Sequence, residues 1–117
     1  MGRLTTHVLD TATGKPCAGM RIGLYRSDGA RHTLLKDTVT NADGRCDAPL
    51  LEGPAFTAAR FRLTFAAAEY FRGQGVALPD PPFVDEVVLD FGLADASLQY
   101  HVPLLVSPWS YSTYRGS

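Results

Sequence analysis

Hydrophobic and polar residues alternate with a period of two along most of the chain, a pattern typical of strands with one buried face. Met20, Ile22 and Leu24, for example, alternate with Arg21 and Tyr25. The same pattern predicts strands over residues 4–9, 20–25, 33–40, 60–65, 86–91, 100–106 and 111–115. Turn-forming residues separate several of these runs, at residues 10–14, 27–29 and 41–44.

Residues 66–73 depart from this alternation. Their alanine run followed by Glu-Tyr-Phe-Arg favours a helix of about two turns packed on a sheet edge, with Gly73 as its C-terminal cap. A proline-rich loop follows at residues 78–82. Short strands joined by turns, seven or more of them, indicate a β-sandwich or a barrel. We therefore expect an all-β fold, a sandwich of seven to eight strands with one short helix.

The predicted strand at residues 100–106 is apolar on both faces. One row of its side chains fits a core, while the other row consists of His101, Pro103 and Leu105. Because a row that faces solvent is normally more polar, we expect this second row to meet another subunit, with His101 in or beside the interface. Pro103 cannot donate to a ladder of strand hydrogen bonds, which predicts an edge strand or a bulge there.

Composition and charge narrow the class of protein. The 117 residues, 45% hydrophobic and 20% charged, fit one globular domain over residues 1–117. The net charge of −1 and the scattered arginines argue against a nucleic-acid partner. No run approaches the roughly 20 apolar residues of a membrane span, so we expect no membrane partner. The N-terminal residues lack an apolar signal region, which favours a cytoplasmic location.

The spacing of cysteine and histidine does not favour a metal site. Cys17 and Cys46 are far apart, and so are the three histidines, His7, His32 and His101. Zinc usually takes four ligands, with Cys or His in close pairs. We therefore expect no metal, and we interpret both cysteines as small apolar side chains.

A few polar residues are candidates for chemistry. His7 and His101 lie in predicted strands, and either could transfer protons near neutral pH or be a hydrogen-bonded surface histidine. His32 follows a turn and is interpreted as a plain surface residue. Arg45 also follows a turn, and it is either solvated or able to clamp a carbonyl, carboxylate or urea-like group. Because no GxSxG, GxGxxG or phosphate loop is present, spacing alone predicts only a small oligomeric β-sandwich with histidines available.

Three blocks of the sequence resemble the transthyretin-like family. Residues 6–16 (THVLDTATGKP) are similar to the family's first strand and turn, and residues 40–45 (TNADGR) to its central turn. The third block begins with YHVPLLVSP at residues 100–108 and ends with YSTYRGS at residues 111–117. The terminal Tyr114, Arg115, Gly116 and Ser117 resemble the signature of the enzyme branch, the 5-hydroxyisourate hydrolases, which transthyretin proper lacks.

The resemblance implies a transthyretin-like β-sandwich that forms a homotetramer, with active sites in a channel between dimers. It implies ring-opening hydrolysis of 5-hydroxyisourate to 2-oxo-4-hydroxy-4-carboxy-5-ureidoimidazoline in urate (purine) degradation, with no cofactor. The family's catalytic set corresponds to His7, Arg45 and His101, and its substrate-binding ending to residues 114–117. We expect His7 to orient or deprotonate water, His101 to assist the proton transfer and Arg45 to bind and polarise the substrate. Swapped roles for the two histidines fit the sequence as well.

The chain departs from the common family pattern at Cys17, at residues 66–67 and at residues 109–110, none of them in the catalytic set. Trp109 precedes the last predicted strand and is expected to affect interface packing or the channel wall. Two other functions compete with the enzyme: a carrier of small aromatic ligands, like transthyretin, and a structural sandwich module. The His–Arg–His set and the terminal YRGS argue against the carrier, and the lack of a signal or linker segment argues against the module.

Overall fold

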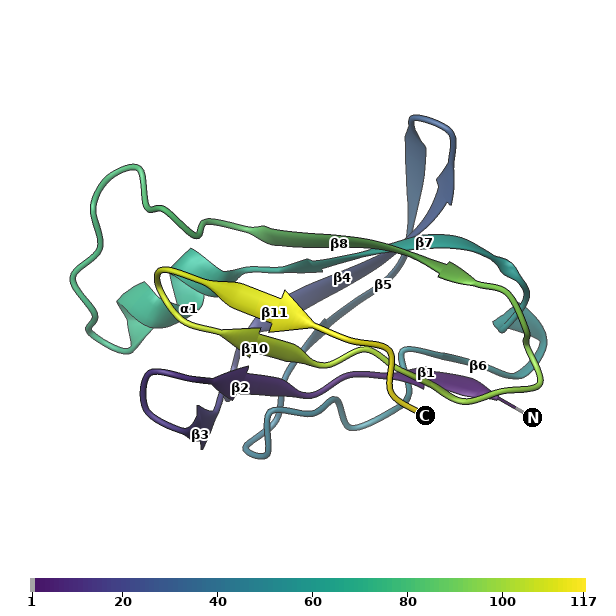
Figure 1. Ribbon diagram of the computed structural model, residues 1–117, viewed down its shortest axis with the longest axis horizontal. Coiled ribbons are helices and arrows are strands. Elements are labelled where there is room, and N and C mark those ends of the chain that lie inside the picture. The colour runs from purple at the N-terminus through teal and green to yellow at the C-terminus, as the bar shows by residue number, and fades with distance from the viewer. Residues whose placement is uncertain (1) are drawn as a thin grey trace.

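The computed structural model describes residues 2–117, and its strands form two layers that face each other (Figure 1). One layer is a regular four-stranded antiparallel sheet. In spatial order its strands are β5 (Arg31–Val39), β4 (Arg21–Asp28), β7 (Ala59–Phe65) and β8 (Val87–Leu93). Gly29 and Ala30 close the hairpin between β4 and β5, and Gly29 has a φ of 61°, a conformation that glycine adopts without steric cost.

The second layer consists of shorter strands in two sheets. The first sheet contains β6 (Leu51–Glu52), β1 (Arg3–Thr5) and β9 (Tyr100–His101) in that order. The second contains β11 (Tyr111–Thr113), β10 (Leu104–Val106), β2 (Val8–Asp10) and β3 (Lys15–Pro16). Since β1 leads into β2 and β9 leads into β10, the two sheets form one interrupted layer (Figure 1). A 3₁₀ turn, η1 (Gly53–Ala55), connects this layer to β7.

The mostly-β sandwich with one α-helix is confirmed, but two predicted strands are each divided. Residues 4–9 form β1 and β2 with a break at Thr6 and His7, and residues 100–106 form β9 and β10 with a break at Val102 and Pro103. The strand segments among residues 2–117 therefore outnumber the seven to eight expected. The breaks lie side by side, because the Val102 amide donates to the carbonyl of Thr5 at 2.9 Å.

Pro103 lies at this break, between β9, which ends the order of its sheet, and β10, so the ladder is interrupted where an edge strand or a bulge was predicted. The following strand, β10, has β11 on one side and β2 on the other. Pro103 is already buried by the chain itself, and its carbonyl accepts a hydrogen bond from the hydroxyl of Thr113 at 2.7 Å. Only His101 and Leu105 of the predicted outer row remain half-buried. Within a single chain, the surface that this row leaves for a partner is therefore smaller than expected.

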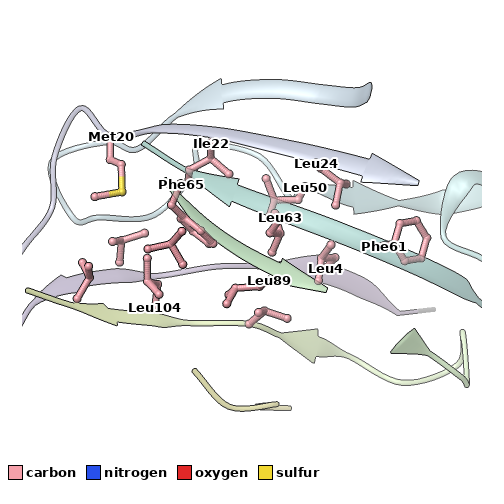
Figure 2. Close-up of a cluster of buried hydrophobic side chains, with 14 of the residues drawn as sticks. Leu4, Met20, Ile22, Leu24, Leu50, Phe61, Leu63, Phe65, Leu89 and Leu104 are labelled. Carbon is pink, nitrogen blue, oxygen red and sulfur yellow. The ribbon is translucent and has the colours of Figure 1, made fainter. Parts of the chain in front are cut away.

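The core lies between the two layers, where their inner rows of side chains meet (Figure 2). These rows include the almost fully buried Leu4, Ile22, Leu24, Leu63, Phe65 and Leu104. Because side chains of a strand alternate between its two faces, every second residue of β1, β2, β9 and β10 must point outward. The candidate catalytic residues of these strands occupy outward positions.

The predicted helix is α1 (Ala67–Gly73), at one end of the sandwich (Figure 1). Its buried residues are Ala67, Ala68 and Phe71, which follow the spacing of one helix face. Gly73 is the last helical residue rather than the cap, and the left-handed conformation belongs to Gly75, with φ 83°. No helix within residues 2–117 has the length and apolar character needed to cross a membrane.

Candidate active site

His7 lies at the break between β1 and β2, on the outer face of the interrupted layer. The hydroxyl of the adjacent Thr6 donates to the carbonyl of Val102 at 2.7 Å inside the core. Since neighbouring residues of an extended chain point to opposite faces, this buried anchor directs His7 outward, where it is half-buried. The Leu104 amide donates to the His7 carbonyl at 2.9 Å, so the His7 backbone is held from the adjacent strand.

The turn at residues 41–44 determines where Arg45 lies. The side-chain oxygen of Asn41 accepts hydrogen bonds from the amides of Asp43 at 2.9 Å and Arg45 at 3.1 Å. Gly44 has a φ of 74°, which disfavours any residue with a Cβ. These are local interactions of the Asn-x-x-Gly segment, so the sequence specifies this turn directly.

The same turn is docked onto β2. A Cβ atom on Gly44 would lie 2.5 Å from the Val8 carbonyl oxygen, so only glycine permits this approach. The Val8 amide donates to the Gly44 carbonyl at 2.8 Å, and Arg45 forms an antiparallel bridge with His7. Arg45 is exposed, and no hydrogen bond or ion pair within residues 2–117 engages its guanidinium. The turn therefore places a free cation beside His7.

His101 is held in β9 by both its backbone and its ring. Its Nδ1 atom lies 2.9 Å from the hydroxyl oxygen of Thr5, the residue that pairs with it in β1. Burial of the ring, followed by the positive charges of Arg45 and His7, lowers the pKa of His101 below its ordinary value. The imidazole of His101 is therefore neutral near pH 7, and Arg45 and His7 lie close enough to act on it electrostatically.

The C-terminal segment runs beside His101. Gly116 and His101 exchange two backbone hydrogen bonds, at 2.7 and 3.1 Å. A Cβ atom on Gly116 would lie 3.2 Å from the Cβ and 3.3 Å from the Cδ2 of His101, so glycine allows this close contact. The guanidinium of Arg115 lies 4.4 Å from the ring centre of Tyr100 and donates to the carbonyl of Gln99 at 3.2 Å. Arg115 thus ties the segment to β9.

Tyr114 and Arg115 face a different part of the surface from the three catalytic candidates. Both line a largely apolar groove of about 400 Å³, whose opposite wall is β8. Tyr114 is 59% exposed. Ser117 is also exposed, and no hydrogen bond within residues 2–117 joins its side chain to His7, Arg45 or His101. Of the four terminal residues, only Gly116 reaches the catalytic candidates in the single chain.

A hollow of about 210 Å³ opens beside Arg45 and Thr5, with Arg3, Cys46 and Asp47 among its other walls. Larger depressions lie elsewhere: the groove beside Tyr114, a depression of about 480 Å³ beside Arg62 and Asp90, and one of about 330 Å³ beside Leu35 and Pro54. Size therefore does not identify the site. The smaller hollow is the relevant one, because it adjoins a free guanidinium and the residue that contacts His101.

The structure brings His7, Arg45 and His101 onto one outer face, although they come from three distant parts of the sequence. It adds Thr5, which the sequence analysis missed; the available signal was that Thr5 and His7 are two residues apart and so share a face. His32 belongs to the other layer, where its Nδ1 lies 2.8 Å from the Ser27 hydroxyl. Its interpretation as a surface residue agrees with this position.

The two cysteines have different surroundings: Cys17 is buried in the core, whereas Cys46 lines the hollow beside Arg45. Both are free thiols, and burial raises the pKa of Cys17 to about 11. Burial also raises the pKa of Cys46. Within residues 2–117, no three His, Cys, Asp or Glu side chains are grouped closely enough to hold a metal ion.

Comparison with known proteins places this geometry in context. The model of the family described as "HIUase/Transthyretin family" matches residues 4–116. The chain is 64% identical over 116 residues to a 5-hydroxyisourate hydrolase of Mesorhizobium japonicum, covering 99% of this chain and 93% of that protein. A solved 5-hydroxyisourate hydrolase of Klebsiella pneumoniae superposes with a TM-score of 0.82 at 34% identity, covering all of both chains. A solved (S)-allantoin synthase superposes with a TM-score of 0.94 at 47% identity over 99% of this chain, which spans 44% of that longer protein.

Proposed function

The chain belongs to the HIUase/transthyretin family, and from this premise we propose that it hydrolyses 5-hydroxyisourate, the substrate in the names of the relatives described above. The observation that carries the proposal is the meeting of His7, Arg45 and His101 on one outer face, with the Arg45 guanidinium free. A protein that only carried an aromatic ligand would have no need for two imidazoles and a free guanidinium at one point of its surface.

The reaction adds water across a cyclic amide. The water oxygen forms a bond to the carbonyl carbon, the ring C–N bond breaks, and the leaving nitrogen receives a proton. His7 orients or deprotonates the water, and His101 assists the transfer of the proton to the leaving nitrogen. The lowered pKa of His101 supports this role, because a neutral imidazole can accept a proton near pH 7 and pass it on.

Arg45 supplies the positive charge that the reaction needs. Attack by water produces an oxyanion on the carbonyl oxygen, and a fixed cation stabilises it more in the transition state than in the substrate. The planar guanidinium also presents paired N–H donors that match a urea-like edge of the ring. Its exposure and the lack of an internal partner leave those donors available to a ligand.

We also propose that residues 1–117 form one domain that assembles into a homotetramer in the cytoplasm. Support for the assembly comes from two strands that lie at the edges of their sheets, β8 and β11, and from the large exposed hydrophobic side chains on and near them. These include Phe83, Val88, Trp109, Tyr111 and Tyr114. Phe83 and Trp109 stack with ring centres 6.2 Å apart while 73% and 61% exposed, a pair that association would cover.

In such an assembly, residues 114–117 bind substrate together with a neighbouring subunit. Their place beside His101 and along the groove next to β8 supports a shared site. Replacing the half-buried Leu105 by Glu is expected to weaken assembly and activity together, because it adds a charge to the apolar outer row. Sedimentation and turnover of the L105E protein would measure both, and a fully active monomer contradicts the shared site.

The proposed activity is tested by generating 5-hydroxyisourate from urate with urate oxidase and following the ultraviolet absorbance of the intermediate. Adding the protein is expected to speed the decay above the spontaneous rate. Binding of the intermediate without faster decay would instead favour the carrier function. The same assay supplies kcat and KM for every variant described below.

A further inference from the structure

The contact between Thr5 and His101 joins two strands at the centre of the candidate site. β1 and β9 run parallel, with Leu4 opposite Tyr100 and Thr5 opposite His101. The hydroxyl oxygen of Thr5 lies 2.9 Å from Nδ1 of His101, which is within hydrogen-bond distance. Thr5 itself is half-buried and lines the hollow beside Arg45.

The His101 ring is restrained on two sides. Nδ1 is occupied by the Thr5 hydroxyl, and the Cδ2 edge faces Gly116, where an added Cβ atom would come within 3.3 Å. The backbone of His101 is fixed at the same time by its two hydrogen bonds to Gly116. Of the two ring nitrogens, Nε2 has no hydrogen-bond partner within residues 2–117.

We propose that Thr5 is a positioning residue which holds His101 with Nδ1 protonated, so that Nε2 is the atom that exchanges protons during the reaction. This inference rests on the proposed function. A neutral imidazole carries one N–H and one lone pair, so a proton on Nδ1 puts the lone pair on Nε2. The Thr5 hydroxyl oxygen accepts a hydrogen bond from the Nδ1–H group, and Nε2 is then able to take a proton from water or the tetrahedral intermediate.

The same hydrogen bond persists through the proton transfer. When Nε2 gains a proton, the resulting cation still donates from Nδ1 to the Thr5 oxygen. When Nε2 releases its proton to the leaving nitrogen, the ring returns to its starting form without rotating. Over the whole cycle the His101 ring takes up one proton and releases one proton, and only the substrate and the water are changed.

Thr11 provides a matched control from the same layer. Its hydroxyl also bonds across the layer, donating to the carbonyl of Val106 at 3.3 Å, and no hydrogen bond within residues 2–117 joins it to a histidine ring. The Thr11 amide donates to the same carbonyl at 2.9 Å, so Thr11→Val removes a threonine hydroxyl but leaves that carbonyl with a hydrogen bond. We therefore expect Thr11→Val to leave turnover unchanged.

The experiment compares Thr5→Val, Thr5→Ser and Thr11→Val with the intact protein in the absorbance assay. Thr5→Val is expected to lower kcat about tenfold with little change in KM, the upper range for loss of one neutral hydrogen bond. Thr5→Ser keeps a hydroxyl and is expected to recover kcat to within about twofold, while Thr11→Val keeps kcat at the level of the intact protein. Equal turnover of Thr5→Val and the intact protein would overturn the proposal.

A second measurement does not depend on activity. Nitrogen NMR of the protein labelled in its histidine rings reports which ring nitrogen of His101 carries the proton. The intact protein and Thr5→Ser are expected to show the Nδ1–H form, and Thr5→Val a shift toward the Nε2–H form that prevails in water. An Nε2–H ring in the intact protein would contradict the inference. If the intact protein shows the Nδ1–H form but does not hydrolyse 5-hydroxyisourate, the proposed function fails while the assigned role of Thr5 in holding the ring stands.

Discussion

The two layers of the sandwich differ in continuity, and the candidate chemistry lies entirely on the one that is broken. The regular layer consists of long strands, β4, β5, β7 and β8, in an antiparallel order with one irregularity, between Leu24 and Tyr25. The interrupted layer consists of segments of two or three residues, with breaks at residues 6–7 and 102–103. At these breaks the backbone bonds to a loop or a terminal segment instead of to a continuous ladder.

The outer faces of the two layers also differ, in whether an arginine there has an acidic partner. On the regular layer, Arg62 and Asp90 satisfy each other through two hydrogen bonds at 2.8 and 3.0 Å. On the interrupted layer, the Arg45 guanidinium has no such partner within residues 2–117. The continuous sheet can pair Arg62 with Asp90 across two neighbouring strands, whereas the interrupted layer receives Arg45 from a turn, with no neighbouring strand residue of the described chain placed to pair with its charge.

The largest difference between the layers is expected for their histidines. His7→Asn and His101→Asn should each lower kcat by about 10²-fold or more, since a general acid or base contributes about 10²–10⁴-fold. His32→Asn, on the regular layer, should leave turnover unchanged, because His32 bonds only to Ser27. The absorbance assay measures all three, with circular dichroism as a check on folding. Near-normal turnover of both His7→Asn and His101→Asn would show that the histidines of the interrupted layer matter no more for catalysis than His32.

The arginines give a second, smaller contrast. Arg45→Lys keeps the positive charge but loses the planar guanidinium with its paired N–H donors. We expect kcat/KM to fall by about tenfold to 10²-fold, which approaches the loss caused by removing a donor to an oxyanion. Arg62→Lys loses a similar fork on the regular layer, where it bonds only Asp90, and should not affect kcat/KM. If the Arg45→Lys protein is fully active, only charge matters at this position.

Two glycines test how closely the C-terminal segment must approach His101. Gly116→Ala would place a methyl group 3.2 Å from the His101 Cβ, while Gly92→Ala in β8 meets no atom within 4 Å. A misplacement of about 1 Å can cost about 10²-fold in rate, so the few tenths of an ångström needed here should lower kcat about threefold to tenfold. Gly92→Ala should be neutral. Identical kcat values for the two variants would show that the Gly116 contact does not position the ring.

The smallest expected effect is on the pH dependence of stability. The pKa of His101 is lowered in the folded protein, so between that pKa and the unfolded value near 6.5 the unfolded chain binds more protons. The free energy of unfolding should therefore fall as the pH drops below about 6.5, and the loss is complete below the folded pKa. In thermal melts, His101→Gln should be less sensitive to acid than the intact protein. If His101→Gln lost more stability in acid than the intact protein does, this prediction would be contradicted.

Local signals predicted the regular layer better than the interrupted one. Alternation located β4, β7 and β8 closely, because long strands with one buried face produce an unmistakable period of two. The breaks at His7 and Pro103 could not be located from this pattern. The alternation of hydrophobic and polar residues continues through both breaks, whereas the hydrogen bonds that define a strand are interrupted there. The cap of α1 was misplaced by one residue: Gly73 ends the helix, Gln74 is the cap, and the left-handed glycine is Gly75.

The site was predicted in part, for similar physical reasons. Family resemblance identified His7, Arg45 and His101, and the structure places them on one face. The spacing of Thr5 and His7 indicated a shared face, but the contact of Thr5 with His101 could not be predicted, because it depends on the parallel register of β1 with β9, which are far apart in the chain. The separation of the Arg115 side chain from the histidines also depends on a nonlocal contact, with Tyr100.

The turn that delivers Arg45 has an evolutionary consequence. Its shape depends on Asn41, which bonds the Arg45 amide, and on Gly44, which alone tolerates the approach to Val8. The Arg45 side chain contributes to neither interaction. Arg45 can therefore be replaced during evolution at little cost to folding, so that the chemistry changes while the fold is kept. Replacement of Gly44, in contrast, would disrupt the fold at this turn.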